Sequence, residues 1–182
     1  MGLEILKTDE LPNYTYDDYV QWEGRWEVID GIPYAMGPTP KRPHQKIAVK
    51  IMAQLEHLLE NCDACQTFPP IDWQITEHTI VQPDVSVVCD EDPDEAKLTR
   101  APVMVFEILS PSTERRDRGV KYRLYENAGV KYYCIVDPKS KNAEVYTLGK
   151  TQYQDKEEFE VGKIHFQIGA CSIAFDFGKI FT

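Results

Sequence analysis

Apolar residues recur along the chain with two periods, and these periods predict two main helices among a larger number of strands. The longest helical pattern covers residues 44–61, where an apolar residue returns every three or four positions. Its predicted inward face consists of Ile47, Ile51, Met52, Leu55, Leu58 and Leu59. We expect this face to form part of the core.

A second helical pattern follows Pro111 and ends at Gly129, because glycine readily adopts the left-handed conformation of a helix C-cap. The predicted inward residues of this helix are Val120, Leu124 and Tyr125. A short helix is also expected over residues 16–22, since Thr15 followed by Asp18 makes a capping-box pattern.

Strand-like runs fill most of the remaining chain. Runs over residues 25–29 and 32–36 flank Asp30-Gly31, which predicts a β-hairpin with a type I′ turn. Pro69-Pro70 makes the next run an edge strand or a bent strand. Strands are expected over residues 71–75, 80–89, 103–109, 132–136 and 143–148, with shorter runs at 152–153, 159–161 and 164–168.

This order of elements predicts a mixed α/β fold. We expect a central mixed sheet flanked by helices, with an N-terminal β-hairpin and a β-rich tail over residues 151–182. The chain has 182 residues, which predicts a single domain over residues 1–182.

Two strand-like runs carry a carboxylate each, where a strand that only builds a core would not need one. Asp84 precedes one run and Glu107 lies within the other. Buried carboxylates are costly unless a cation compensates them. Because Mg²⁺ prefers a few carboxylate oxygens and leaves other positions to water and substrate, we expect Asp84, Glu107 and the Ile108 carbonyl to hold Mg²⁺. Lys121 on the following helix would orient or deprotonate water, or neutralise a phosphate.

The motifs around these residues resemble the PD-(D/E)xK nuclease superfamily and, more narrowly, the Uma-two-type restriction endonuclease family. The similarity covers roughly residues 15–150. It lies in Trp26-Glu27-Val28-Ile29-Asp30-Gly31, Gln82-Pro83-Asp84, Glu107-Ile108-Leu109-Ser110-Pro111-Ser112-Thr113, Tyr125-Glu126-Asn127-Ala128-Gly129-Val130 and Tyr133-Cys134-Ile135-Val136-Asp137-Pro138. The resemblance implies a restriction-endonuclease-like fold and a Mg²⁺-dependent endonuclease that hydrolyses DNA phosphodiester bonds.

The resemblance also implies roles for individual residues. Glu27 matches an accessory acid of the metal site, although an exposed polar face of the hairpin explains it equally well. The superfamily places a lysine two residues after the second acid, where this chain has Leu109, and Lys121 is the matching position in the narrower family. An ordinary ion pair with Asp117, four residues earlier, is the alternative for Lys121.

Two further residues are candidates for binding the substrate. His44 lies in the first turn of the long helix, where the helix dipole favours a phosphate, and the resemblance places a histidine there. Arg118 belongs to a basic group on the later helix, made of Arg115, Arg116, Arg118, Lys121 and Arg123. These basic residues either contact phosphate or simply solvate a helix face.

Composition limits the compartment and the partners. The net charge of −10 argues against a protein that coats nucleic acid through its overall field. With no secretory signal and no run of about 20 apolar residues, we expect a cytoplasmic protein without a membrane span. The five cysteines are an odd number, so disulfides are not expected. Cys62 and Cys65 form a lone CxxC without a second pair for zinc.

Two functions from different classes remain open. The first is a DNA endonuclease, expected as a homodimer because cutting both strands needs two sites. The second is an inactive nuclease-like fold that serves as a protein-binding or dimerisation module, with Glu107 held by a fixed arginine such as Arg123. Nucleotide hydrolysis is not supported, since the chain has no phosphate-loop motif. The acidic run over residues 90–95 lacks the spacing of a calcium loop and predicts a solvated connection.

Overall fold

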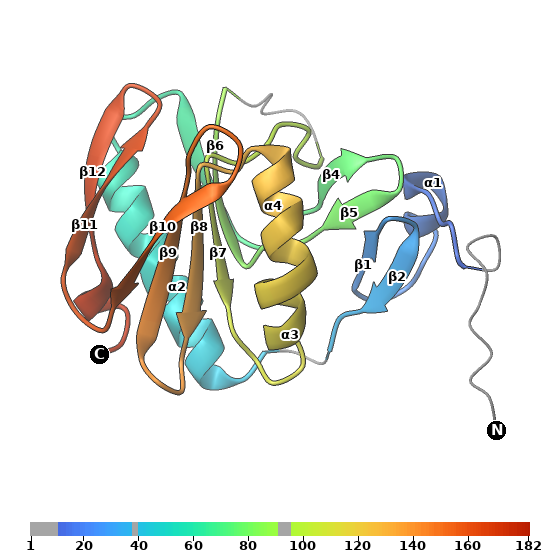
Figure 1. Ribbon diagram of the computed structural model, residues 1–182, viewed down its shortest axis with the longest axis horizontal. Helices are drawn as coiled ribbons and strands as arrows, with labels where there is room; N and C mark the ends of the chain where they lie inside the picture. The colour runs from blue at the N-terminus through green and yellow to red at the C-terminus, as the bar shows by residue number, and fades with distance from the viewer. Residues whose placement is uncertain (1–10, 38–39, 91–95) are drawn as a thin grey trace.

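The computed structural model describes residues 11–37, 40–90 and 96–182, with Asp155 described by its backbone alone. Its helical elements are α1 (Tyr16–Tyr19), α2 (Arg42–Leu59), α3 (Glu114–Arg116), the π-helical segment η2 (Asp117–Lys121), α4 (Tyr122–Ala128) and the short 3-10 turn η3 (Phe177–Lys179). Its strands are β1 (Trp26–Ile29), β2 (Ile32–Ala35), β3 (Cys65–Phe68), β4 (Trp73–Thr76), β5 (Thr79–Val81), β6 (Val85–Cys89), β7 (Met104–Ile108), β8 (Tyr132–Asp137), β9 (Asn142–Leu148), β10 (Tyr153–Phe159), β11 (Lys163–Ile168) and β12 (Cys171–Asp176). Figure 1 shows their arrangement.

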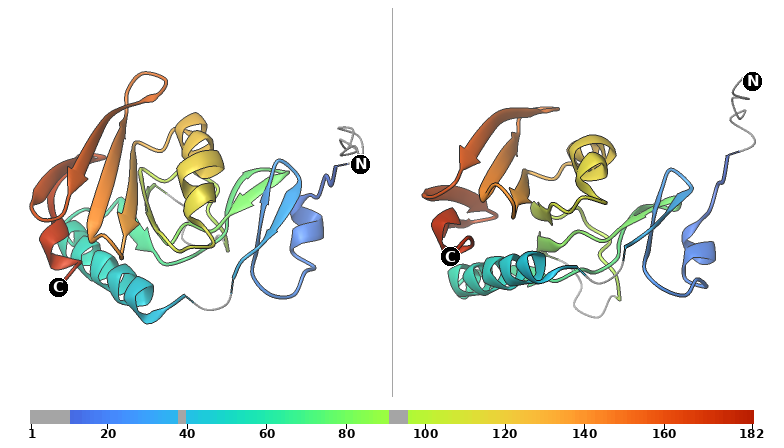
Figure 2. Two further views of the ribbon diagram at one scale, coloured as in Figure 1. Left: turned by 60° about the horizontal axis from the view of Figure 1, so that its bottom comes forward. Right: turned by 90° about the horizontal axis from the view of Figure 1, so that it is seen from below.

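A six-stranded sheet in the order β10-β9-β8-β7-β6-β3 forms the centre of the fold. β7 and β8 pair in parallel, and the other neighbours pair antiparallel. Parallel neighbours need a crossover connection, which α3, η2 and α4 supply between β7 and β8. α2 covers one face of the sheet and the crossover helices lie on the other, as Figures 1 and 2 show. The predicted mixed α/β fold with helices flanking a central mixed sheet is confirmed.

Side chains of the central strands alternate between two hydrophobic clusters, one on each face. The cluster under α2 includes Ile47, Ile51, Leu55, Leu59, Met104, Phe106 and Ile108, with Met52 and Leu58 packed against it. The cluster under α4 includes Val105, Leu109, Tyr125, Tyr133 and Ile135. The predicted apolar face of the long helix is therefore core. Glu107 shares the strand face of Val105 and Leu109, so it points toward the crossover helices.

The predicted N-terminal hairpin is part of a second sheet with the order β2-β1-β5-β4. Asp30 and Gly31 have φ of 50° and 77°, the two positive values that a type I′ turn requires. β4 is an edge strand, in agreement with the prediction from Pro69-Pro70, which precede it. Thr15 caps α1 and Asp18 completes the capping box. β1 pairs with β5, which attaches the hairpin to the segment just before Asp84.

Gly31→Ala should lower the free energy of unfolding by about 1–3 kcal/mol. An added Cβ at Gly31 would lie 2.7 Å from the Asn13 Cα, and the φ of 77° is itself unfavourable for alanine. Gly119→Ala is the matched control, because its Cβ would meet nothing within 4 Å. Urea unfolding of both variants measures the effect. Equal stability of the two variants would contradict the turn geometry.

The single strand predicted over residues 80–89 is wrong. The chain forms β5 and then β6, which belong to different sheets, with Gln82, Pro83 and Asp84 between them. Pro83 has no backbone N–H to donate to a strand ladder, so the chain leaves the smaller sheet there and enters the central one. This break places Asp84 at the junction of the two sheets.

The predicted β-rich tail is confirmed. β10 extends the central sheet beside β9, and β11 and β12 form a hairpin of their own. That hairpin packs on α2, where the Gln54 side chain and the Asp176 backbone exchange hydrogen bonds of 2.8 and 3.1 Å. β3 and β12 are absent from the predicted strands. Residues 91–95 of the predicted acidic loop lie outside the described residues.

The expectation that the cysteines stay unpaired is wrong. Disulfides join Cys62 to Cys171 and Cys65 to Cys89, and Cys134 is buried and free. The partners are 109 and 24 residues apart, so only the pairing of β3 with β6 and the packing of β12 on α2 bring them together. Among the helices of the described residues, none is both long and apolar enough to cross a membrane.

Candidate active site

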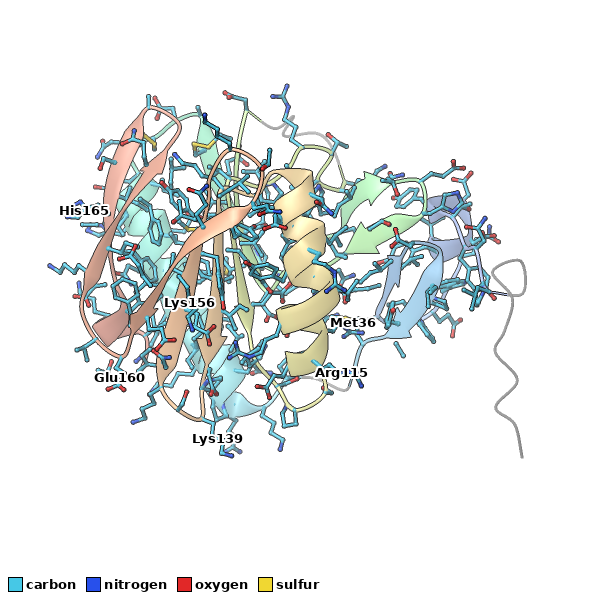
Figure 3. All side chains as sticks on the ribbon, in the orientation of Figure 1. Met36, Arg115, Lys139, Lys156, Glu160 and His165 are labelled. Atoms are coloured by element: carbon cyan, nitrogen blue, oxygen red, sulfur yellow. A yellow bond between two sulfur atoms is a disulfide. The ribbon has the colours of Figure 1, made fainter. Side chains whose placement is uncertain are left out.

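A pocket of about 820 Å³ lies where the carboxyl ends of β7 and β8 meet the amino end of α2 and the start of α3, at the lower end of the sheet in Figure 1. Asp84, Glu107 and Lys121 line it. The residues around them come from five separate stretches of chain, and two of them, Met36 and Lys139, are labelled in Figure 3. The fold therefore gathers four of the predicted site residues, His44, Asp84, Glu107 and Lys121, at one end of the central sheet.

Asp84 is fixed at the junction of the two sheets. Its Oδ2 accepts a hydrogen bond of 2.8 Å from the Ile108 backbone N–H, and the same oxygen lies 3.1 Å from Nε2 of His44. The Asp84 side chain is 16% exposed, on the pocket side. These contacts join three of the residues predicted from sequence.

Glu107 lies on β7 and faces the crossover helices. Its Oε1 accepts hydrogen bonds from Nζ of Lys121 at 2.9 Å and from the hydroxyl of Tyr125 at 2.6 Å. Burial raises the pKa of Glu107 well above its ordinary value; Lys121 opposes this shift and the nearby acids add to it. The arginine expected to hold Glu107 in an inactive fold, Arg123, is exposed and is not its partner.

Glu27 belongs to this cluster, although it comes from the hairpin. Its side chain is completely buried, so the interpretation as an exposed polar residue is wrong. Oε1 of Glu27 accepts a hydrogen bond of 3.0 Å from the Gln82 backbone N–H and lies 2.7 Å from Nζ of Lys121. Its Oε2 has no hydrogen-bond partner among the described residues.

Lys121 connects the carboxylates. It lies at the end of the π-helical segment η2, a local structure often found at functional sites, and its side chain is only 2% exposed. Burial alone would lower the pKa of Lys121, but Glu107, Glu27 and Asp117 outweigh it and raise the pKa above its ordinary value. The ammonium is therefore charged at neutral pH. Lys121 is a buried member of the cluster, and the ion pair with Asp117 that was its alternative interpretation is present as well.

Asp117 is a fourth carboxylate that the sequence did not single out for the site. Its Oδ1 lies 3.9 Å from Nζ of Lys121, and the side chain is 1% exposed. Burial raises the pKa of Asp117 to about 6, while Lys121 acts in the opposite direction. The sequence could have indicated Asp117, because it lies four residues before Lys121 and the two residues therefore share one helix face.

Asp117→Asn should stabilise the protein above pH 6. The folded-state pKa of about 6 exceeds the ordinary 3.8, so the contribution of Asp117 to stability is present below pH 4 and lost as pH rises to 6. The gain of the variant over wild type should grow across this window to about 2–3 kcal/mol. Denaturant unfolding from pH 4 to pH 8 measures it.

Asp137→Asn is the control, with the opposite sign. Burial opposes ionisation of Asp137, but hydrogen bonds from Ser140 and Lys139 outweigh it and lower the pKa. This variant should lose stability at neutral pH and recover relative to wild type as pH falls. The same pH trend in both variants would contradict the assignment for Asp117.

The predicted phosphate-binding arginine lies outside the pocket. Arg118 forms ion pairs with Glu144 at 2.8 Å and Glu114 at 3.4 Å, and it does not line the pocket. Arg116 lines the pocket instead: its Nε lies 3.7 Å from Oε2 of Glu27, and its guanidinium lies over the Tyr34 ring. Nothing in the sequence separates Arg116 from Arg118, because the directions of their side chains depend on the π-helical segment η2.

The carboxylates that line the pocket suit a cation that needs few protein ligands. In this disulfide-bonded form, the described residues contain no group of three or more His, Cys, Asp or Glu side chains that could hold a metal ion. Asp84 and Glu107 nevertheless line one pocket, and Asp84 binds the backbone of Ile108. Two carboxylates beside an open pocket fit Mg²⁺, which usually keeps several waters.

The fold and the pocket define a restriction-endonuclease-like α/β protein. The structure is similar to a crystal structure from Anabaena variabilis described as "a putative nuclease belonging to DUF820", with a TM-score of 0.73 and 18% identity, covering 92% of this chain and 97% of that one. Residues 16–165 match the Uma2 family model, described as "Putative restriction endonuclease". The uncharacterized protein slr1290 of Synechocystis is 35% identical over 143 residues, 75% of each chain. The chain belongs to the Uma2 family, which confirms the resemblance.

Proposed function

We propose that this protein is a Mg²⁺-dependent endonuclease that hydrolyses phosphodiester bonds in DNA. The observation that carries the proposal is a cluster of acids and a lysine from four separate stretches of chain. Asp84, Glu107 and Lys121 line one pocket, and the buried Glu27 contacts Lys121 at 2.7 Å. Three carboxylates and a buried lysine are costly to bring together, and a structural role does not require it. The family match supports the nuclease class.

Asp84 and Glu107, with the Ile108 carbonyl, would hold the Mg²⁺. A bound Mg²⁺ supplies Lewis-acid activation of a phosphate oxygen and of the attacking water. The hydrogen bond from the Ile108 N–H keeps the Asp84 carboxylate turned toward the pocket. Glu27 acts indirectly, because it fixes the position of the Lys121 ammonium.

Of the two roles expected for Lys121, its environment favours the electrostatic one. A lysine acts as a base only when its pKa falls toward the working pH, and here the three carboxylates raise it. A charged ammonium beside the scissile phosphate stabilises the negative charge that grows in the transition state. Lys121 therefore binds phosphate charge and leaves proton transfer to other groups.

Basic residues around the pocket reconcile phosphate binding with the net charge of −10. Arg25, Lys41, His44, Arg116 and Lys139 line the pocket together with Lys121. The Arg25 guanidinium is held by two hydrogen bonds to Oε1 of Gln82, at 3.2 and 3.0 Å. A local basic rim attracts a polyanion even when the overall charge repels it, with an affinity that falls as salt rises.

Arg116→Ala should weaken DNA binding, with a KM increase of about tenfold or more, the scale of one lost charged contact. Arg118→Ala is the matched control, since Arg118 pairs with Glu144 outside the pocket. Cleavage of a fluorescent oligonucleotide at several salt concentrations measures both variants. A larger KM increase for Arg118→Ala would reverse the assignment.

A second candidate function is an inactive fold that binds another protein or dimerises. One observation favours it: Lys121 already contacts both Glu107 and Glu27, at 2.9 and 2.7 Å, so the acids have a cation without a metal. This function predicts a stable apoprotein that neither binds metal nor cleaves nucleic acid.

Nicking of supercoiled plasmid separates the two functions. The nuclease requires nicking with Mg²⁺ or Mn²⁺ that stops when EDTA is added, whereas the binding module gives none with either ion. A homodimer is part of the nuclease proposal, because two sites would cut both strands. Sedimentation of the purified chain tests the dimer separately from the chemistry.

A further inference from the structure

Four of the five cysteines gather at the end of β6 opposite Asp84. Cys62 and Cys65 frame the turn after α2, in which the Cys65 backbone N–H donates to the Cys62 carbonyl at 2.9 Å. Cys89 ends β6, and Cys171 begins β12. Cys62 and Cys65 are buried in the cluster under α2, and Cys89 and Cys171 pack against the same cluster. Sulfur is yellow in Figure 3, which draws the disulfides.

The two disulfides are neighbours in space. Gly169, two residues before Cys171, would place a Cβ 3.7 Å from Sγ of Cys65 and 4.0 Å from Sγ of Cys89. The turn that leads into Cys171 therefore lies beside the Cys65–Cys89 disulfide. In the sequence, Cys62 and Cys65 have no second cysteine pair nearby. The fold brings Cys89 and Cys171 to them.

We propose that these four cysteines, when reduced, form a structural Zn²⁺ site with four thiolate ligands. A CxxC turn with two more cysteines is the usual donor set of a closed tetrahedral zinc site. The sulfurs come from α2's end, β3, β6 and β12, so one ion would join the same elements that the disulfides join. The site is independent of the proposed nuclease chemistry.

The conversion balances in electrons and protons. Each disulfide accepts two electrons and two protons from a dithiol reductant, which becomes a disulfide itself, and yields two thiols. Zn²⁺ then displaces the four thiol protons, which pass to solvent, because only thiolates bind the metal. Either state cross-links the end of α2 to the C-terminal hairpin, whereas the reduced metal-free state does not.

Co²⁺ is the probe that identifies sulfur ligands. The full-length chain is treated with a phosphine reductant, which is oxidised to its oxide, and five free thiols are verified by titration. Addition of Co²⁺ should give thiolate-to-metal charge-transfer absorption and strong visible bands at one ion per chain. Zn²⁺ should abolish this absorption by displacement and raise the Tm of the reduced protein. The oxidised protein should give no such absorption.

Variants locate the site. Cys171→Ser should lose the four-thiolate spectrum, and Cys134→Ser, which removes the buried cysteine outside the group, should keep it. Asp84→Asn should also keep it, which separates this site from the proposed Mg²⁺ site. The proposal is overturned if the reduced wild type has five thiols but binds Co²⁺ without charge-transfer absorption, or if Cys171→Ser retains the wild-type spectrum.

Discussion

Replacing Lys121 with methionine should abolish cleavage and lower the free energy of unfolding by about 3–5 kcal/mol, the scale for removing one partner of a buried ion pair. Lys121 is the cation that contacts Glu27 and Glu107 within 3 Å, and both carboxylates are buried. Methionine has a similar length, so the loss reports charge rather than volume. Denaturant unfolding and plasmid nicking of the same preparation measure the two effects.

A second substitution separates stability from activity. Lys121→Met combined with Glu107→Gln removes one positive and one negative charge, so it should recover a large part of the lost stability but none of the cleavage. Lys139→Met is the control for stability, because Lys139 lines the same pocket but is exposed. Stability of Lys121→Met equal to wild type would contradict the buried cluster, and cleavage by it would exclude the proposed phosphate role.

Asp84→Asn should reduce cleavage at least about 100-fold, the scale for removing one electrostatic group from an active site. The asparagine carbonyl can still accept the hydrogen bond from the Ile108 N–H, so the fold should survive. The loss of one negative charge should weaken divalent metal binding. Initial nicking rates at rising Mg²⁺ measure both consequences.

Asp137→Asn is the matched control for this prediction. Asp137 lines the same pocket, but its partners are Ser140 and the Lys139 backbone and not the carboxylate cluster. Its nicking rate should stay within a few-fold of wild type. Equal rates for Asp84→Asn and wild type would remove Asp84 from the site.

The fold was predictable where local pattern and local chemistry agree. The stripe along α2, the Asp30-Gly31 turn and the Gly129 cap each depend on residues close in sequence, and each is present. The boundary between β5 and β6 depends on which sheet the chain joins on each side of Pro83. Periodicity does not contain that information, so one strand was predicted where there are two.

The sequence pointed to three of the four acids of the candidate site, but it did not single out Asp117 and it indicated the wrong arginine. A carboxylate is unusual directly before an apolar strand, as Asp84 is, or within one, as Glu107 is, and Lys121 matched the family pattern. The choice between Arg116 and Arg118 depends on the π-helical segment, which changes the direction of the side chains and has no sequence signature among five basic residues. The cysteine pairs likewise depend on contacts between distant strands.

The most direct test of the proposed nuclease is calorimetric titration of Mn²⁺ into the reduced and the oxidised wild-type protein, repeated with Asp84→Asn. We predict that both redox forms of the wild type bind Mn²⁺ in the pocket, that the variant loses this binding, and that nicking follows the same pattern. If the wild type gives no binding heat and no nicking in either form, the active nuclease is contradicted, and the binding module becomes the function of this fold.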